Sequence, residues 1–256
     1  MDKKDFYVVA REPGVENPLL PTWANTKANP ANLSESHSVE KIIRRDIPEA
    51  RGTYQLLNVL AGDECRRLIA LSENLGYLPD AAVSLPRDVR HNDNVVWVVD
   101  EQTDSIIWQR VEKLAQQSLA IFSDKKPLGI NARFRFYRYK QGDYFKSHTD
   151  GAWPGSRVIN GKLVTNAYSD RYSLMTFLIL LNDDFTGGAT RFVVEEEDPN
   201  LPSGRTGKVN FVDVRTPAGA VLCFPHGMHR LHCVHSSQPI SSGVKYIIRT
   251  DMLFEC

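Results

Sequence analysis

Hydrophobic residues follow a helical spacing in two stretches of the first half of the chain. In each stretch they recur every three or four residues, which places them on one face of an amphipathic helix. The predicted helices span residues 63–75, where Gly76 can end the helix, and residues 104–122. Their apolar faces consist of Leu68, Leu71 and Leu75 in the first helix, and Ile107, Val111, Leu114 and Ile121 in the second.

After Gly129 the apolar residues fall instead into short runs separated by Gly, Pro, Asn and Asp. This pattern is typical of a β-sandwich or barrel. The predicted strands are 133–140, 144–148, 173–181, 189–194, 209–214, 220–224, 230–235 and 244–254, with earlier short strands near 42–43, 54–60 and 95–98. We therefore expect a mostly β protein: a cupin-like jelly roll (double-stranded β-helix) backed by N-terminal helices.

The N-terminal residues differ in composition from the rest of the chain. Residues 1–40 are rich in Pro, Asn and Ser, and we expect an extended arm with no regular structure of its own. The apolar faces of the two predicted helices must pack against a sheet, so residues 41–256 are expected to form one domain. Within it, residues 41–128 would supply the helical support and residues 129–256 the jelly-roll core.

Charge and cysteine content narrow the range of partners. Lys and Arg together number 31, as do Asp and Glu, so the composition favours neither a nucleic-acid nor an anionic-membrane partner. No apolar run is long enough to span a bilayer, and no apolar core follows the N-terminal charges as in a secretory signal. The four cysteines are too few for a disulfide framework in 256 residues. We expect reduced thiols and a cytoplasmic location.

The segment His148-Thr149-Asp150 carries candidate metal chemistry. Side chains on an extended segment repeat with period two, so His148 and Asp150 share one face while Thr149 points away. An imidazole beside a carboxylate provides two of the three ligands in a His/carboxylate/His facial metal site. The tripeptide alone is a weak signal, and its value depends on a third ligand elsewhere.

Candidates for that third ligand occur near the C-terminus, where four histidines are spaced by three residues: His226, His229, His232 and His235. A facial site needs only one of them, and spacing alone does not identify it. Another of the four would suit a hydrogen-bonded position behind the ligands, and solvated loop positions would suit the rest.

Three segments together carry a family resemblance. They are FRFYRYKQGDYFKSHTDG, LMTFLILLNDDFTGGATRF and PAGAVLCFPH…VHSSQPISSGVKYIIRTDML, and they lie within residues 129–254. In this order they resemble the prolyl 4-hydroxylase-like branch of the iron(II)- and 2-oxoglutarate-dependent dioxygenases. In that family the distal histidine lies ten residues before the lysine of a Gly-x-Lys-Tyr segment, which here is Lys245 and points to His235. His232 is the alternative, because one turn of the loop could bring it to the metal.

The resemblance implies iron held by His148, Asp150 and His235, with 2-oxoglutarate and O2 at the open positions and ascorbate as a possible reductant. Lys245 would bind the distal carboxylate of 2-oxoglutarate, assisted by Tyr139 and by Thr176. Two positions depart from the family pattern. Leu180 stands where many relatives carry a tyrosine, and Ser236-Ser237 stands where Glu-Gly is commoner.

The substrate would meet the strand that carries Tyr139. Period two places Arg133, Arg135 and Tyr137 on the same face, and Phe134 and Phe136 on the other, toward the helices. A polar, cationic wall of this kind suits a substrate with carboxylate or amide groups. We also expect substrate contacts from Trp153 and Tyr168 in the long loop 151–170, and from Arg90 and Asn92. Arg249 shares a face with Asp251, and either an ion pair between them or contact with a ligand is open.

The expected function is hydroxylation of an unactivated C–H bond with release of succinate and CO2. A prolyl residue of a peptide or protein is the first expected substrate, and a free amino acid or natural-product intermediate is the second. Because one fold serves many functions, a non-catalytic metal- or ligand-binding jelly roll is the alternative from another class.

Overall fold

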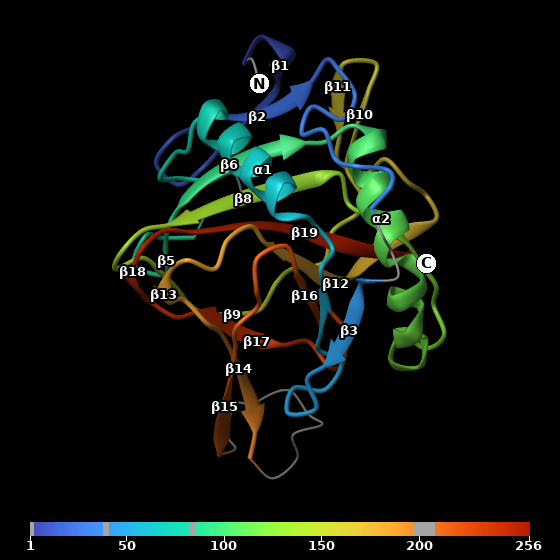
Figure 1. Ribbon diagram of the computed structural model, residues 1–256, viewed down its shortest axis with the longest axis vertical. Helices are drawn as coiled ribbons and strands as arrows, with labels where there is room; N and C mark the ends of the chain where they lie inside the picture. Colours follow the sequence, from blue (N-terminus) through green and yellow to red (C-terminus); the bar gives the residue numbers. More distant parts are fainter. Residues whose placement is uncertain (1–2, 38–40, 82–84, 197–207) are drawn as a thin grey trace.

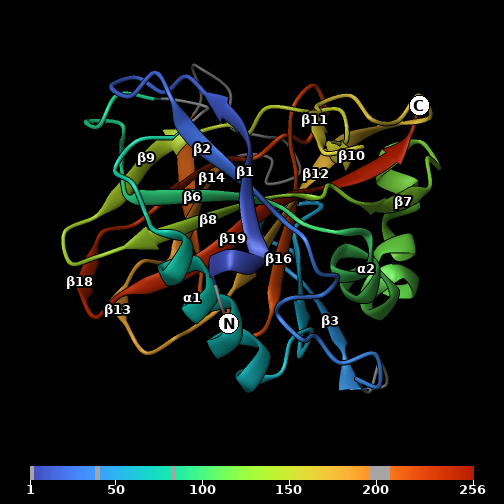
Figure 2. The ribbon, with the colours of Figure 1, turned by 90° about the horizontal axis from the view of Figure 1, so that it is seen from above.

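The protein is arranged in three layers, in a computed structural model that describes residues 3–37, 41–81, 85–196 and 208–256 (Figure 1). A large sheet lies in the middle, the two α-helices cover one of its faces, and a smaller sheet faces the other (Figure 2). The helical elements are η1 (Lys3–Asp5), α1 (Gly62–Leu75), α2 (Glu101–Ala115) and η3 (Gln116–Phe122).

Ten strands form the large sheet, and all of its pairings are antiparallel except the parallel pair β2–β6. Across the sheet the strands are β1 (Phe6–Glu12), β2 (Leu20–Asn25), β6 (Asp93–Val98), β8 (Arg133–Tyr139), β19 (Lys245–Glu255), β12 (Arg171–Leu180), β16 (Val221–Pro225), β4 (Tyr54–Leu57) and β3 (Ile43–Asp46), with β7 (Pro127–Ile130) also paired to β19.

The smaller sheet has five strands: β15 (Val209–Val214), β14 (Thr190–Glu195), β17 (Val234–Ser237), β9 (Tyr144–His148) and β5 (Arg90–His91). Two two-stranded pairs complete the described strands: the hairpin of β10 (Arg157–Ile159) with β11 (Lys162–Val164), and the long-range pair of β13 (Thr186–Gly187) with β18 (Ile240–Ser242). Two facing sheets with helices outside one of them confirm the predicted jelly roll backed by helices.

Both predicted helices are present, and their ends have local causes. Glu64 accepts a hydrogen bond from the Ala61 backbone N–H at 2.8 Å, which satisfies a free donor at the start of α1, and Gly76 ends the helix with a φ of 97°. Asp100 caps α2 by accepting from the Thr103 N–H at 3.1 Å. The second helix therefore begins earlier than predicted, and its last part is the 3₁₀ turn η3.

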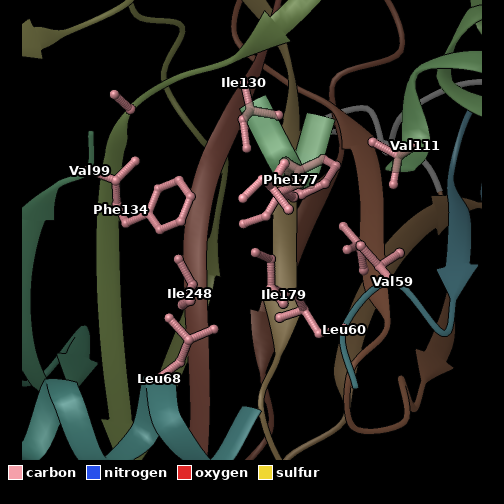
Figure 3. Close-up of a cluster of buried hydrophobic side chains, with 14 of the residues drawn as sticks. Val59, Leu60, Leu68, Val99, Val111, Ile130, Phe134, Phe177, Ile179 and Ile248 are labelled. Atoms are coloured by element: carbon pink, nitrogen blue, oxygen red, sulfur yellow. The ribbon is translucent and has the colours of Figure 1, made fainter. Parts of the chain in front are cut away.

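The main hydrophobic core lies between the helices and the large sheet (Figure 3). Leu68 of α1 and Val111 of α2 are fully buried against outward-facing residues of the sheet, such as Phe134, Phe177 and Ile248. Phe134 and Phe136 thus face the helices as predicted. Tyr137 and Tyr139 of β8 belong instead to a second core, between the two sheets.

The N-terminal segment was expected to lack regular structure, and this expectation is wrong. Strands β1 and β2 pair with each other, and β2 extends the large sheet by pairing with β6. Long-range pairing of backbone groups overrides the local preference of a Pro- and Asn-rich sequence. A smaller correction concerns the predicted strand 230–235, because residues 229–232 form turns and β17 begins only at Val234.

Other expectations from composition can be compared directly with the structure. All four cysteines are free. Among the described residues, no helix has the length and apolar character needed to cross a bilayer.

Candidate metal centre and its pocket

Three potential ligands converge between the two sheets. His148 lies at the end of β9, Asp150 follows two residues later, and His235 on β17 is the register partner of His148. The Nε2 atom of His148 lies 3.8 Å from Asp150 Oδ1, and the Nε2 atom of His235 lies 3.8 Å from Asp150 Oδ2. The three ligand atoms lie within 4.8 Å of one another, so one ion could reach all of them.

The tautomers of both histidines suit metal binding. His148 Nδ1 lies 2.8 Å from the Lys146 carbonyl oxygen, and His235 Nδ1 lies 3.1 Å from that of Cys233. A carbonyl can only accept, so each Nδ1 carries the proton and each Nε2 keeps a free lone pair. Backbone carbonyls fix metal-binding histidines in this way and set their ring orientation.

Electrostatics also favour the protonation states that a metal requires. Burial lowers the pKa of His148 to about 3, with His235 adding to the effect, and burial likewise lowers the pKa of His235. For Asp150, burial acts in the opposite direction, but Arg249 and then the two histidines hold the pKa of the carboxyl well below its usual value. The site therefore presents two neutral imidazoles and one carboxylate.

A chain of hydrogen bonds runs from the backbone of Trp153 to the carboxylate. The Trp153 N–H donates to Ser173 Oγ at 2.7 Å, and Ser173 Oγ lies 3.0 Å from His226 Nε2. His226 Nδ1 lies 2.9 Å from Thr176 Oγ1, whose hydroxyl donates to Asp150 Oδ2 at 2.7 Å. Since one end of the chain is a donor and the other an acceptor, each hydroxyl proton points toward Asp150, with His226 protonated at Nδ1.

This chain places Thr176 behind the metal ligand. Its hydroxyl is engaged by Asp150 and His226, and the side chain does not line the pocket. The sequence had suggested a contact with 2-oxoglutarate beside Lys245. Thr176 is opposite Asp251 in the β12–β19 register, whereas Leu180, four pairs further along, is opposite Ile247. This register separates Thr176 from the Lys245 end.

A pocket with about 420 Å³ of atom-free space, its open mouth included, lies beside the three ligands. One of its lining residues is Lys245, which is 1% exposed. Its Nζ donates to the Gly188 carbonyl at 2.7 Å and to Ser237 Oγ at 3.2 Å, and it lies 5.3 Å from the Tyr139 ring centroid. No carboxylate pairs with it among the described residues, and burial lowers its pKa to about 7.

Ser237 and Gly188 were missed as site residues from the sequence. Ser237 could have been found, because period two on β17 puts it on the same face as His235. No comparable signal exists for the carbonyl of Gly188, the residue that directly follows β13.

Two arginines and one aspartate lie along the wall near the metal ligands. Arg249 lines the pocket, with its Nε 3.4 Å from Asp150 Oδ2 and its Nη2 2.9 Å from Asp251 Oδ1. Arg135 is its register partner on β8 and reaches Asp251 Oδ2 at 3.6 Å. The Arg249–Asp251 ion pair that the sequence left open is therefore formed, and Arg249 also faces the pocket.

The other expected substrate contacts differ in position. Tyr137 lines the pocket, and the Arg90 guanidinium lies 5.8 Å from the ring centroids of both Tyr137 and Phe145. Trp153 packs 5.6 Å from the Arg135 guanidinium, outside the pocket lining.

Tyr168 and Asn92 also lie outside the pocket lining. The Tyr168 hydroxyl accepts from Arg157 at 2.7 Å and serves the loop itself. The buried Asn92 accepts from the Asn94 side chain at 3.1 Å.

The remaining histidines have structural contacts. His229 Nε2 lies 2.8 Å from the Ile121 carbonyl oxygen, and its ring packs on Phe122. His232 Nδ1 lies 3.1 Å from the His229 carbonyl oxygen. His232, the alternative ligand, is not part of the three-residue cluster that the described side chains form.

Comparison with known proteins gives a structural likeness without a close sequence relative. No protein-family model matches the chain, and no curated protein matches it. A prolyl hydroxylase from Trichoplax adhaerens, solved with a hypoxia inducible factor peptide fragment, superposes with a TM-score of 0.50 at 14% identity, covering 86% of this chain and 88% of that one. The chain shares the fold of this hydroxylase.

Two other solved structures are similar at lower scores. A prolyl-4-hydroxylase from Pseudomonas putida has a TM-score of 0.48 at 16% identity, covering 78% of this chain and 91% of that one. An oxidoreductase of the 2OG-Fe(II) oxygenase family from Burkholderia pseudomallei has a TM-score of 0.48 at 14% identity, covering 79% and 85%.

Proposed function

We propose that this protein is an iron(II)- and 2-oxoglutarate-dependent dioxygenase that hydroxylates an unactivated C–H bond. The observation that carries the proposal is the combination, in one pocket, of a His148/Asp150/His235 ligand set and a buried lysine, Lys245, with which no carboxylate of the described residues pairs. Two imidazoles and one carboxylate form the facial set that leaves positions open on ferrous iron. A buried, uncompensated ammonium is costly, and a dianionic co-substrate removes that cost.

The chain's own residues would have distinct tasks. His148, Asp150 and His235 would hold the iron, and Thr176 would fix the Asp150 carboxylate by donating a hydrogen bond to its Oδ2 atom. Lys245 would bind the distal carboxylate of 2-oxoglutarate, next to the buried Tyr139. Apolar walls that include Leu178 and Phe224 limit the access of water. When bound, iron and 2-oxoglutarate would supply the oxidation: one oxygen atom of O2 would enter the hydroxyl group, and the other would enter the succinate that forms, with CO2, from 2-oxoglutarate.

A prolyl residue of a peptide or protein is the first candidate substrate. It is supported by the resemblance of the sequence motifs and by the fold shared with a hydroxylase solved with a peptide fragment. A small molecule such as a free amino acid is the second candidate. It is favoured by the buried arginines beside the metal ligands, since an internal prolyl residue offers them no negative charge.

The proposal can be tested by measuring succinate formed from 2-oxoglutarate by the purified protein with ferrous iron, ascorbate and a broad substrate panel. We expect turnover that His148→Ala abolishes, with loss of metal binding. Lys245→Met should raise the KM for 2-oxoglutarate and leave metal affinity nearly unchanged. His232→Ala, in the same loop as the distal ligand, is the matched control and should behave as wild type. Absence of any turnover would favour a binding module instead, and full activity of both site variants would refute the assignment.

A further inference from the structure

The pocket beside the metal ligands contains more positive than negative side chains. Lys245 and Arg249 line it, and Arg90 lies over the ring of Tyr137, another lining residue. Arg135 is buried directly beside Arg249. Apart from the ligand Asp150, the carboxylate that faces these cations in the described structure is Asp251, which both Arg135 and Arg249 share.

The hydrogen bonds of these arginines are incomplete. Arg249 Nε and Nη2 and Arg135 Nη1 are buried without a well-aligned hydrogen bond, although carboxylates lie nearby. No described carboxylate or carbonyl accepts a hydrogen bond from the Arg90 side chain, which is 7% exposed. Burial, with a contribution from Arg249, lowers the pKa of Arg135 to about 10. Unpaired donors on a buried cation are costly, so an additional acceptor would stabilise this cluster.

Metal and co-substrate binding would increase the imbalance near Arg249. A bound divalent cation would neutralise the negative charge of Asp150, which otherwise offsets the positive charge of Arg249. The two carboxylates of 2-oxoglutarate are accounted for by the metal and by Lys245. Arg249 lies four residues from Lys245 on the same strand, or about 13 Å along it. One small dianion therefore cannot readily bind to both side chains at once.

Resting on the proposed dioxygenase function, we propose that the primary substrate carries a free carboxylate that binds to the Arg249 guanidinium, with Tyr137 and Arg90 at the same wall. Arginine binds carboxylates through charge-assisted hydrogen bonds, and the Arg249 side chain lines the pocket. Arg249 Nε lies 3.4 Å from a ligand oxygen, so the hydroxylated carbon lies only a few bonds from that carboxylate. This geometry fits a free amino acid or the C-terminal residue of a peptide better than an internal prolyl residue, which has no carboxylate.

Matched acids and amides test the proposal. The iron- and 2-oxoglutarate-loaded protein is supplied with free L-amino acids including proline, their amides, peptides ending in proline as free acid or amide, and a peptide with internal proline. We expect at least one free acid to accelerate 2-oxoglutarate consumption while its amide does not. Free amino acids and peptide acids distinguish the two sources of the carboxylate. The proposal is overturned if no acid accelerates the reaction, or if amides or internal proline work equally well.

Variants distinguish substrate binding at Arg249 from co-substrate binding at Lys245. Arg249→Met should raise the substrate KM by roughly 10- to 150-fold, the loss expected for a charge-assisted hydrogen bond, with little change in the KM for 2-oxoglutarate. Arg90→Met, further from the ligands, should raise the substrate KM more weakly and protects the test if Arg249→Met fails to fold. Arg191→Met removes a surface arginine paired with Asp213 and is the control. If Arg249→Met instead raises the KM for 2-oxoglutarate, this anchor is wrong while the dioxygenase assignment stands.

Discussion

Removing the Thr176 hydroxyl would test whether the hydrogen-bond chain behind Asp150 positions the metal ligand. Valine has nearly the same shape as threonine but cannot donate to Asp150 Oδ2, the 2.7 Å contact of the wild-type protein. Without this donor, Oδ2 keeps only the more distant Arg249 and the carboxylate is free to rotate. A hydrogen bond to a charged group contributes about 1.5–3 kcal/mol, and loss of such outer contacts typically weakens metal binding by 10–100-fold.

The measurement is a calorimetric titration of the metal-free protein with Mn²⁺, supported by a urea unfolding curve for each variant. Thr176→Val should weaken Mn²⁺ binding by roughly 10–100-fold. It should also lower the free energy of unfolding by about 1–3 kcal/mol, because His226 Nδ1 loses its acceptor. Thr176→Ser keeps the hydroxyl and should bind Mn²⁺ within a few-fold of wild type. Wild-type affinity in Thr176→Val, or equal losses in both variants, would refute the positioning role.

Two further predictions concern other buried charges. Burial lowers the pKa of Lys245 from 10.5 to about 7, and a bound dianion would restore the positive charge of this side chain. Binding of 2-oxoglutarate above pH 7 should therefore be coupled to the uptake of one proton. Its affinity should fall by up to tenfold per pH unit between pH 7 and 10.5. Calorimetry in buffers of different ionisation enthalpy measures this uptake, which Lys245→Arg should remove; no uptake by the wild-type protein at pH 8.5 would contradict it. In the second, Arg110→Met should lower the free energy of unfolding in urea by about 3–5 kcal/mol, because it leaves the buried Glu64 carboxylate, bound at 2.7 Å and 2.9 Å, without its cation. A loss below about 1 kcal/mol would show that Glu64 is satisfied by its backbone donors alone.

Strand periodicity explains why much of the site could be predicted from the sequence. On β8 the alternation separates Phe134 and Phe136, which pack toward the helices, from Tyr137 and Tyr139, which face the second core. The same rule brings His148 and Asp150 to one side. These features depend only on neighbours in the chain, which the sequence contains directly.

The position of a residue along its strand, relative to the pocket, could not be predicted in this way. Thr176 and Leu178 share a face of β12, but only Leu178 lines the pocket. The difference is set by the register of β12 against β19, a long-range pairing with no local signal. The position of Tyr168 depends similarly on a partner, Arg157, that only the folded loop brings near.

The N-terminal hairpin has a consequence for self-association. Strands β1 and β2 occupy the edge that β6 would otherwise present, with Trp23 opposite Trp97 in the register. Asn25 accepts the Trp97 indole N–H at 2.8 Å, and Phe6 packs edge-on against the same ring at 5.6 Å. A chain shortened to begin at residue 41 would expose an apolar, unpaired strand, the kind of edge on which foreign strands can add. Such a chain should therefore aggregate, as light scattering would detect, because β1 and β2 would no longer cover the edge on which intermolecular sheets can grow.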